Sequence, residues 1–401
     1  MTDLTELIAA FTARYGEPPA NVVRAPGRVN LIGEHIDYNG LSVLPMAIQR
    51  RVTLLFRPRT DPIVRIANTQ KEFSTRSFAL SAEIEPYPEG DWGNYLKAAA
   101  QALAQQFGAL SGFDAVMTSD IPVASGLSSS SALTVAAAMP LVEVNRLDTD
   151  RTMLAELLAR AERYVGTEGG GMDQAVCLGA SEGAALRVDF EPLRMSAAPI
   201  PNGIAIVVAS SLVRAEKSGA ARDMYNRRTR ECREALEAVL GNVKKRKGID
   251  SYPTLLAKFD AAELVELGDT VLGDDLRRRF RHVVSEAARV TRMETALAAG
   301  DVAEVGRILN ESHASLRDDY AVSTSELDEL TELAVAGGAS GARLTGAGLG
   351  GCIVAACPPK GAEALIESLT EGFYQPRSAT KDLDQHLFVA RPSGGTSVEP
   401  L

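Results

Sequence analysis

Residues 24–39 read Arg24-Ala25-Pro26-Gly27-Arg28-Val29-Asn30-Leu31-Ile32-Gly33-Glu34-His35-Ile36-Asp37-Tyr38-Asn39, so titratable side chains stand close to apolar residues and glycines. A core strand is not expected to carry so many ionisable groups, because burying each unpaired one costs several kcal/mol. A solvated loop has no need of Leu31, Ile32 and two glycines at these positions. The segment therefore predicts a polar site on a partly buried backbone.

A second motif is the serine-rich loop Pro122-Val123-Ala124-Ser125-Gly126-Leu127-Ser128-Ser129-Ser130-Ser131-Ala132, between a predicted strand and a predicted helix. Helix N-termini expose unpaired N–H groups and bind anions. The serine hydroxyls could add donors or reach Mg²⁺. The alternative is a helix cap with spare serines. The Walker A pattern, which is the common phosphate-binding loop, occurs nowhere in the sequence.

A third motif contains Glu162 and the segment Gly166-Thr167-Glu168-Gly169-Gly170-Gly171-Met172-Asp173-Gln174. Three glycines before Asp173 let the backbone approach a ligand and aim the carboxylate. Read alone, the segment could be a loop with an exposed acid. Its occurrence together with the other motifs favours a functional site.

The segment Leu344-Thr345-Gly346-Ala347-Gly348-Leu349-Gly350-Gly351 contains the spacing G-x-G-x-x-G. A dinucleotide fingerprint would follow a strand and open a helix. Here the glycines lead into residues 352–355, which are typical of a strand. We therefore reject the dinucleotide interpretation and expect a glycine-rich hairpin that approaches a phosphate or another backbone.

Composition limits the class of protein. The 401 residues, 45% of them hydrophobic and 23% charged, suit a soluble chain of two or three domains. A net charge of −10 argues against a nucleic-acid partner. The four cysteines form no C-x-x-C pair, which favours free thiols in the cytoplasm. The N-terminal segment predicts an amphipathic helix rather than a secretion signal, and no apolar run is long enough to predict a membrane span.

Hydrophobic patterns predict an α+β chain with a change of domain near residue 195. Strands are expected at 21–25, 51–56, 62–67, 113–119, 204–209, 342–345, 352–356 and 386–390. Helices are expected at 95–107, 130–145, 152–164, 217–309 with a break at 247–253, 326–336 and 362–370. Residues 236–309 hold no recognisable chemistry and are expected to be a packing scaffold.

The three motifs around residues 24–39, 122–132 and 162–174, in this order, resemble those of the galactokinase branch of the GHMP small-molecule kinases. Three shorter matches support the resemblance: Leu44-Pro45-Met46-Ala47-Ile48, Trp92-Gly93-Asn94-Tyr95 and Ser315-Leu316-Arg317-Asp318-Asp319-Tyr320. The resemblance implies a two-domain α+β fold. Residues 1–195 would form a mixed-sheet domain like domain 2 of ribosomal protein S5, and residues 196–401 a ferredoxin-like α+β sandwich.

The resemblance also implies an activity in the cleft between the domains. ATP would phosphorylate the C1 hydroxyl of galactose, giving galactose 1-phosphate and ADP, with Mg²⁺ as the metal. The sugar would be the partner, with no nucleic acid or membrane involved, and the protein would be a cytoplasmic monomer or weak dimer.

Site residues follow from the resemblance position by position. Asp173 would be the catalytic carboxylate that faces the anomeric hydroxyl, and Arg28 would orient it and neutralise phosphoryl charge. The sugar would contact Glu34, His35, Asp37, Gly170 and Tyr225. The nucleotide would contact Trp92, Gly126, Leu127, Ser128, Ser129, Ser130, Gly346 and Gly348. Ser130 and Glu162 would be ligands of Mg²⁺.

Three alternatives remain open. Many galactokinases have Cys-Gly-Ile-Met-Asp-Gln where this chain has Gly169-Gly170-Gly171-Met172-Asp173-Gln174, which is more like N-acetylgalactosamine kinases. The extra glycines could leave room for a 2-acetamido group, so an N-acetylgalactosamine 1-kinase is the main alternative. A non-catalytic galactose and ATP sensor is disfavoured by the full serine loop. A kinase for mevalonate-like or homoserine substrates is disfavoured by the cluster at residues 34–37.

Overall fold

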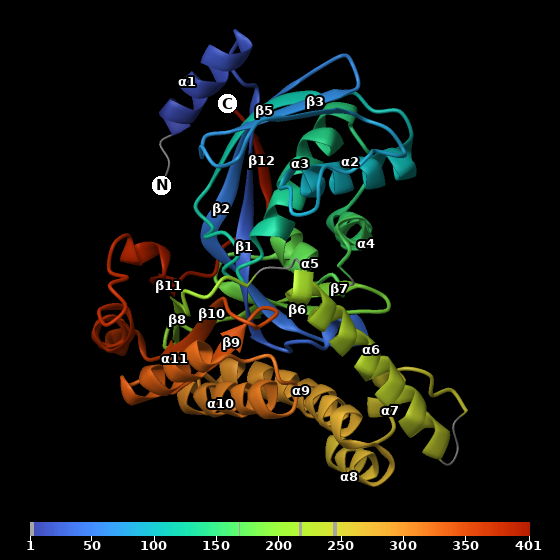
Figure 1. Ribbon diagram of the computed structural model, residues 1–401, viewed down its shortest axis with the longest axis vertical. Coiled ribbons are helices and arrows are strands. Elements are labelled where there is room, and N and C mark those ends of the chain that lie inside the picture. The colour runs from blue at the N-terminus through green and yellow to red at the C-terminus, as the bar shows by residue number, and fades with distance from the viewer. Residues whose placement is uncertain (1–3, 168, 216–218, 244–246) are drawn as a thin grey trace.

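The computed structural model describes residues 4–167, 169–215, 219–243 and 247–401, which form two large sheets and a two-stranded hairpin, with helices packed on the sheets (Figure 1). The helices are α1 (Leu4–Tyr15), α2 (Gly93–Phe107), α3 (Ser129–Asn145), α4 (Arg151–Ala161), α5 (Met172–Gly179), α6 (Gly219–Asn242), α7 (Tyr252–Leu256), α8 (Ala261–Val271), α9 (Asp274–Ala299), α10 (Val302–Asp318), α11 (Ser325–Ala336) and α12 (Ala362–Leu369). The strands are β1 (Asn21–Ile32), β2 (Leu44–Pro58), β3 (Ile63–Asn68), β4 (Arg76–Ala79), β5 (Phe113–Ser119), β6 (Ala184–Asp189), β7 (Arg194–Pro199), β8 (Ala205–Ser210), β9 (Gly341–Thr345), β10 (Cys352–Cys357), β11 (Leu387–Ala390) and β12 (Ser397–Pro400).

The first sheet has the strand order β12-β1-β2-β5-β3-β4. Strands β3 and β5 pair in parallel and the other described neighbours pair antiparallel, so the predicted mixed sheet is confirmed. Helix α1 packs on this sheet through Leu7 and Phe11, which meet Val22, Leu55 and Val116 in a small separate core. The alanine-rich α3 packs against β1 and β2 and contributes to the main core.

Strand β1 runs through much of the segment at residues 24–39, although a core strand was not expected there. Its residues from Ala25 to Ile32 are all buried. The burial of charge is offset by pairing, because Arg28 meets Asp173 in an ion pair. Irregularities at Pro26/Arg28 and Asn30/Ile32 interrupt the regular pairing of β1 with β2, as bulges do where a strand redirects its side chains.

The second sheet has the order β11-β8-β10-β9, and its paired strands are antiparallel. Helices α10, α11 and α12 pack on it, and α9 packs against α10. This arrangement confirms the predicted ferredoxin-like sandwich. Within the parts of the chain that the structure describes, no helix combines the length and apolarity needed to cross a bilayer.

The path of the last residues differs from the expected division of the chain. Strand β12 pairs with β1, with Pro400 opposite Asn21, so residues 397–400 complete the first sheet and not the second. The expectation that residues 196–401 all belong to the second domain is therefore wrong for this strand. The boundary near residue 195 stays a prediction, and it falls inside the hairpin β6–β7.

Candidate active site

An arginine on β1 and an aspartate on α5 form the centre of the site. Arg28 Nε donates to Asp173 Oδ1 at 2.7 Å, and both side chains are buried. Arg28 Nη1 also donates to the Gly126 carbonyl at 2.6 Å. Burial alone would lower the pKa of Arg28, but the carboxylates of Asp173 and Glu34 raise it. The fold thus brings together two residues that lie far apart in the sequence, as predicted.

A buried hydroxyl links Asp173 to a second acid. Ser131 Oγ donates to Glu162 Oε1 at 3.0 Å and lies 3.5 Å from Asp173 Oδ2. The sequence analysis named Ser130 and Glu162 as ligands of Mg²⁺ and gave Ser131 no role. The four serines from Ser128 to Ser131 look alike in sequence, and only the turn of α3 decides which one faces inward.

A cleft of about 770 Å³ opens beside this pair. Predicted residues on its wall are Arg28, Trp92, Gly126, Ser128, Ser129 and Ser130. Ser128 Oγ is buried and has no hydrogen-bond partner among the described residues. The nucleotide contact of Leu127 stays a prediction; its side chain is buried in the core and its carbonyl accepts from the Arg28 N–H at 3.1 Å.

The lining of the cleft contains both aromatic and basic side chains. One wall is aromatic, where Phe73 and Trp92 meet edge to face with ring centres 6.1 Å apart and Tyr87 lies nearby. Three arginines also line the cleft, and none of them was predicted: Arg163, Arg214 and Arg222. Arginine guanidinium groups suit phosphate, so their presence in the lining of the cleft favours an anionic ligand.

The Glu34 side chain links the segment at residues 24–39 to the glycine-rich hairpin through a hydrogen bond. Its Oε2 accepts from the Gly346 N–H at 2.9 Å and also pairs with the buried Arg343. Burial raises the pKa of Glu34, and Arg343 and Arg28 oppose that rise. The predicted sugar ligand is thus held by protein groups, including an arginine that sequence reasoning missed.

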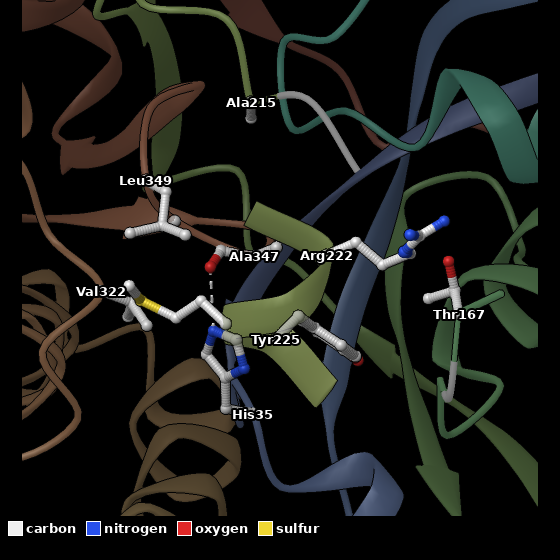
Figure 2. A pocket seen from close by; sticks show the side chains of 10 residues that line it. His35, Thr167, Ala215, Arg222, Tyr225, Val322, Ala347 and Leu349 are labelled. Carbon is white, nitrogen blue, oxygen red and sulfur yellow. Dashed lines mark hydrogen bonds between the residues drawn. The ribbon is translucent and has the colours of Figure 1, made fainter. Parts of the chain in front are cut away.

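His35 lies in a small cavity next to Tyr225, Ala347 and Gly348 (Figure 2). Its Nε2 lies 3.1 Å from the Ala347 carbonyl, which can only accept, so the proton must be on Nε2. Nδ1 then accepts from the Tyr38 hydroxyl at 2.9 Å. Burial lowers the pKa of His35 to about 3, so the ring is neutral.

Asp37 and Gly170 lie in contact. A Cβ atom on Gly170 would lie 2.4 Å from the Asp37 carbonyl carbon and the Tyr38 nitrogen, so a larger residue cannot fit there without a shift. Burial, followed by the charge of Asp173, raises the pKa of Asp37 to about 7. Burial and Asp37 also raise the pKa of Tyr225 well above its usual value. Of the predicted sugar ligands, Asp37, Gly170 and Tyr225 therefore lie near Asp173.

The glycine-rich hairpin approaches another backbone, as predicted. Gly346 has φ +88°, and a Cβ atom on it would lie 2.7 Å from the Gly126 carbonyl oxygen. Ala347 lines both the large cleft and the small cavity, whereas Gly348 lines the small cavity. Ala215 and Arg222 also line both spaces, so the two spaces are adjacent.

No cluster of three or more His, Cys, Asp or Glu side chains suited to a metal ion is found in the described ranges. Ser130 and Glu162 offer a hydroxyl and a carboxylate, which are hard oxygen donors of the kind that Mg²⁺ prefers. A Mg²⁺ ion commonly takes one or two protein oxygens together with phosphate oxygens and water. The residues present fit that pattern.

Three segments of the chain match known protein families. Residues 9–58 match the galactokinase galactose-binding signature. Residues 94–180 match the N-terminal domain of GHMP kinases, and residues 293–375 match the C-terminal domain of GHMP kinases.

Whole-chain relatives point the same way. The sequence is 38% identical to a galactokinase of Roseiflexus sp. (strain RS-1), over 98% of this chain and 97% of the relative. It is also 38% identical to a galactokinase of Chloroflexus aggregans, over 93% of each.

Solved structures agree with the sequence relatives. The structure of Lactococcus lactis galactokinase complexed with galactose superposes with a TM-score of 0.87 at 30% identity, over 98% of this chain and 99% of that one. Methanococcus jannaschii mevalonate kinase shares the fold, with a TM-score of 0.59 at 17% identity over 93% of this chain and 98% of that one.

Proposed function

The chain belongs to the galactokinase family of the GHMP kinases, and on this premise we propose that it transfers the γ-phosphoryl group of ATP to the C1 hydroxyl of galactose. The products are galactose 1-phosphate and ADP. The observation that carries the proposal is the buried pair of Arg28 and Asp173, which stands between the large cleft and the cluster of His35, Asp37 and Tyr225.

Phosphoryl transfer depends mainly on positioning and charge neutralisation, because its transition state is loose. The C1 oxygen forms a bond to the γ-phosphorus while the bond to the β,γ-bridging oxygen breaks. Asp173 accepts the hydroxyl proton, and the ion pair with Arg28 holds the carboxylate in place. Arg28 is cationic and reaches the cleft, so it also opposes the negative charge of the phosphoryl group.

The large cleft has side chains suited to both the adenine and the phosphates of ATP. The adenine would pack against the aromatic side chains at Trp92. The phosphates would bind at the serine loop. The Ser128 Oγ in this loop is buried without a partner among the described residues, and a phosphate oxygen would accept its hydrogen bond. Ser130 and Glu162 would hold Mg²⁺, which supplies charge neutralisation on the phosphates when bound. Ser131 keeps the Glu162 carboxylate oriented.

The polar groups near Asp173 suit a sugar, because Asp37 and Tyr225 lie close enough to Asp173 to feel its charge. Axial and equatorial hydroxyls point in different directions, so a fixed acceptor such as Asp37 is left unpaired by the wrong epimer. The Tyr225 hydroxyl adds a polar group that needs no counter-charge, whereas both ring nitrogens of the predicted sugar ligand His35 are already hydrogen-bonded to Tyr38 and Ala347. Galactose is therefore preferred over its epimers.

The structure does not favour the N-acetylgalactosamine alternative. A Cβ atom on Gly169 would lie 3.0 Å from Glu162 Oε2, and one on Gly171 would lie 2.9 Å from Ala159 Cβ. The side chains that these glycines lack would thus point toward Glu162 and helix α4. The space that they leave is occupied by the protein.

The test is ADP release in the presence of ATP and Mg²⁺ with a panel of acceptors. The panel contains galactose, N-acetylgalactosamine, glucose, mevalonate and no acceptor. Release with galactose alone is the expected result. Equal or faster release with N-acetylgalactosamine would contradict the choice of sugar, and silence with every sugar would contradict the assignment as a kinase.

A further inference from the structure

Helix α9 carries buried polar side chains that contact the turn at residues 33–35. From the sequence, residues 236–309 are expected to be a packing scaffold. Instead, His282 and Glu286 on α9 are fully buried, and both face the backbone of Gly33 and Glu34. Helix α9 lies with α10 below the long strand β1 in Figure 1, and it packs against β1.

The backbone of this turn is in an unfavourable conformation. Gly33 has φ +94°, and His35, which has a side chain, has φ +63°. A residue with a Cβ atom adopts the left-handed region only where surrounding contacts hold it there. A Cβ atom on Gly33 would also lie 3.1 Å from Val290 of α9, so the helix packs directly on the turn.

The Glu286 carboxylate accepts hydrogen bonds from backbone N–H groups of the turn. Its Oε1 accepts from the Gly33 N–H at 2.9 Å and from the Glu34 N–H at 3.2 Å, while Oε2 accepts from Arg289 Nε at 2.7 Å. Burial alone would raise the pKa of Glu286, but Arg289, His282 and Arg343 lower it to about 2. The carboxylate is therefore ionised and makes strong hydrogen bonds to both amides.

His282 holds the carbonyl side of the same turn. Its Nε2 lies 3.0 Å from the Glu34 carbonyl oxygen, so the ring must donate there, and Nδ1 lies 3.0 Å from Ser315 Oγ. Burial lowers the pKa of His282 to about 4, so the ring is neutral. Positions 282 and 286 lie one helical turn apart, and together they hold three peptide groups of residues 33 and 34.

We infer that His282 and Glu286 are positioning residues for galactose binding. They hold the turn at residues 33–35 in the conformation that directs Glu34 and His35 to the glycine-rich hairpin and the small cavity. They act on the substrate through the turn and leave Asp173 untouched. The inference rests on the proposed function, because it assigns galactose to this side of the site.

The first test compares variants of Glu286 with a matched control on the same helix. Glu286→Ala leaves two buried amides without an acceptor, so the KM for galactose should rise about 10-fold or more. The KM for ATP and the kcat at saturating galactose should stay within about 3-fold. Glu286→Gln keeps one acceptor oxygen and should have a smaller effect. Glu294→Gln removes an ion pair to Arg187 and should change neither KM.

The second test keeps the inference open to refutation if Glu286→Ala fails to fold. His282→Phe keeps the ring contact with Tyr320, whose centre lies 4.5 Å away, but removes the donor to Glu34. The KM for galactose should rise in His282→Phe and fall back in His282→Gln, whose amide can donate again. The inference is overturned if folded variants keep the galactose KM of the unmodified protein. It is also overturned if the KM values of galactose and ATP rise equally. A lack of galactose-dependent ADP release by the unmodified protein would instead refute the proposed function.

Discussion

Asp37 is a buried carboxylate placed close to another carboxylate, and this arrangement destabilises the folded protein when both are charged. Burial and the neighbouring Asp173 raise the pKa of Asp37 from its usual 3.8 to about 7, although backbone groups of Tyr38 and Met172 oppose the rise. The substitution Asp37→Asn keeps the shape of the side chain and removes the charge. The variant should therefore be more stable than the unmodified protein at alkaline pH in the absence of sugar.

The size and sign of the effect follow from the two pKa values. The folded state binds the Asp37 proton more tightly than the unfolded state, so its stabilising effect is complete below pH 3.8 and is lost as the pH rises through about 7. The effect is lost between pH 3.8 and about pH 7, and about two pH units of that range lie between pH 5 and pH 8. Each pH unit corresponds to about 1.4 kcal/mol. The advantage of Asp37→Asn should thus grow by about 3 kcal/mol from pH 5 to pH 8.

Denaturant unfolding at pH 5 and at pH 8 measures this quantity. The free energy of unfolding is compared between the two proteins at each pH, so the titration of all shared groups cancels. Asp275→Asn, at the exposed start of α9, is the control and should show the same difference at both pH values. An advantage of Asp37→Asn that does not change with pH would refute the reasoning, because Asp37 would then be ionised already at pH 5.

Three further substitutions test other parts of the site. Asp173→Asn should lower kcat at least about 10²-fold while calorimetry still detects galactose binding, and near-normal turnover would remove Asp173 from catalysis. Gly170→Ala should lower the melting temperature by a few degrees, because its methyl group meets the backbone of Asp37, whereas Gly203→Ala, with no atom within 4 Å, should not. Trp92→Ala should raise the KM for ATP about 10-fold and leave the KM for galactose unchanged, and the reverse pattern would exclude an adenine contact.

Local sequence pattern was sufficient for elements that form an uninterrupted buried run. Strand β5 was predicted at its observed bounds, because six of its seven residues are buried between neighbouring strands. Strand β12 was not predicted, since its residues are partly or fully exposed and it has no apolar pattern. Its position depends on pairing with β1, which lies at the other end of the sequence.

The site residues also divide into those that sequence motifs indicate and those that only tertiary packing shows. The motifs at residues 24–39, 122–132 and 162–174 pointed to Arg28 and Asp173, and the structure joins them by a hydrogen bond. Ser131 was missed because local sequence does not distinguish it from its neighbours. His282 and Glu286 were missed because histidine and glutamate on a helix are usually solvated, and only tertiary packing shows that these two are buried.

The pairing of β12 with β1 has a consequence for the time course of synthesis. Strand β1 leaves the ribosome early, and the strand that covers its outer edge follows only after the whole second sheet has been made. During that interval the nascent chain exposes unpaired N–H and C=O groups at residues 21–24 of β1, and such edges recruit other chains. Translation rate and chaperone access at this stage therefore bear on the yield of folded protein.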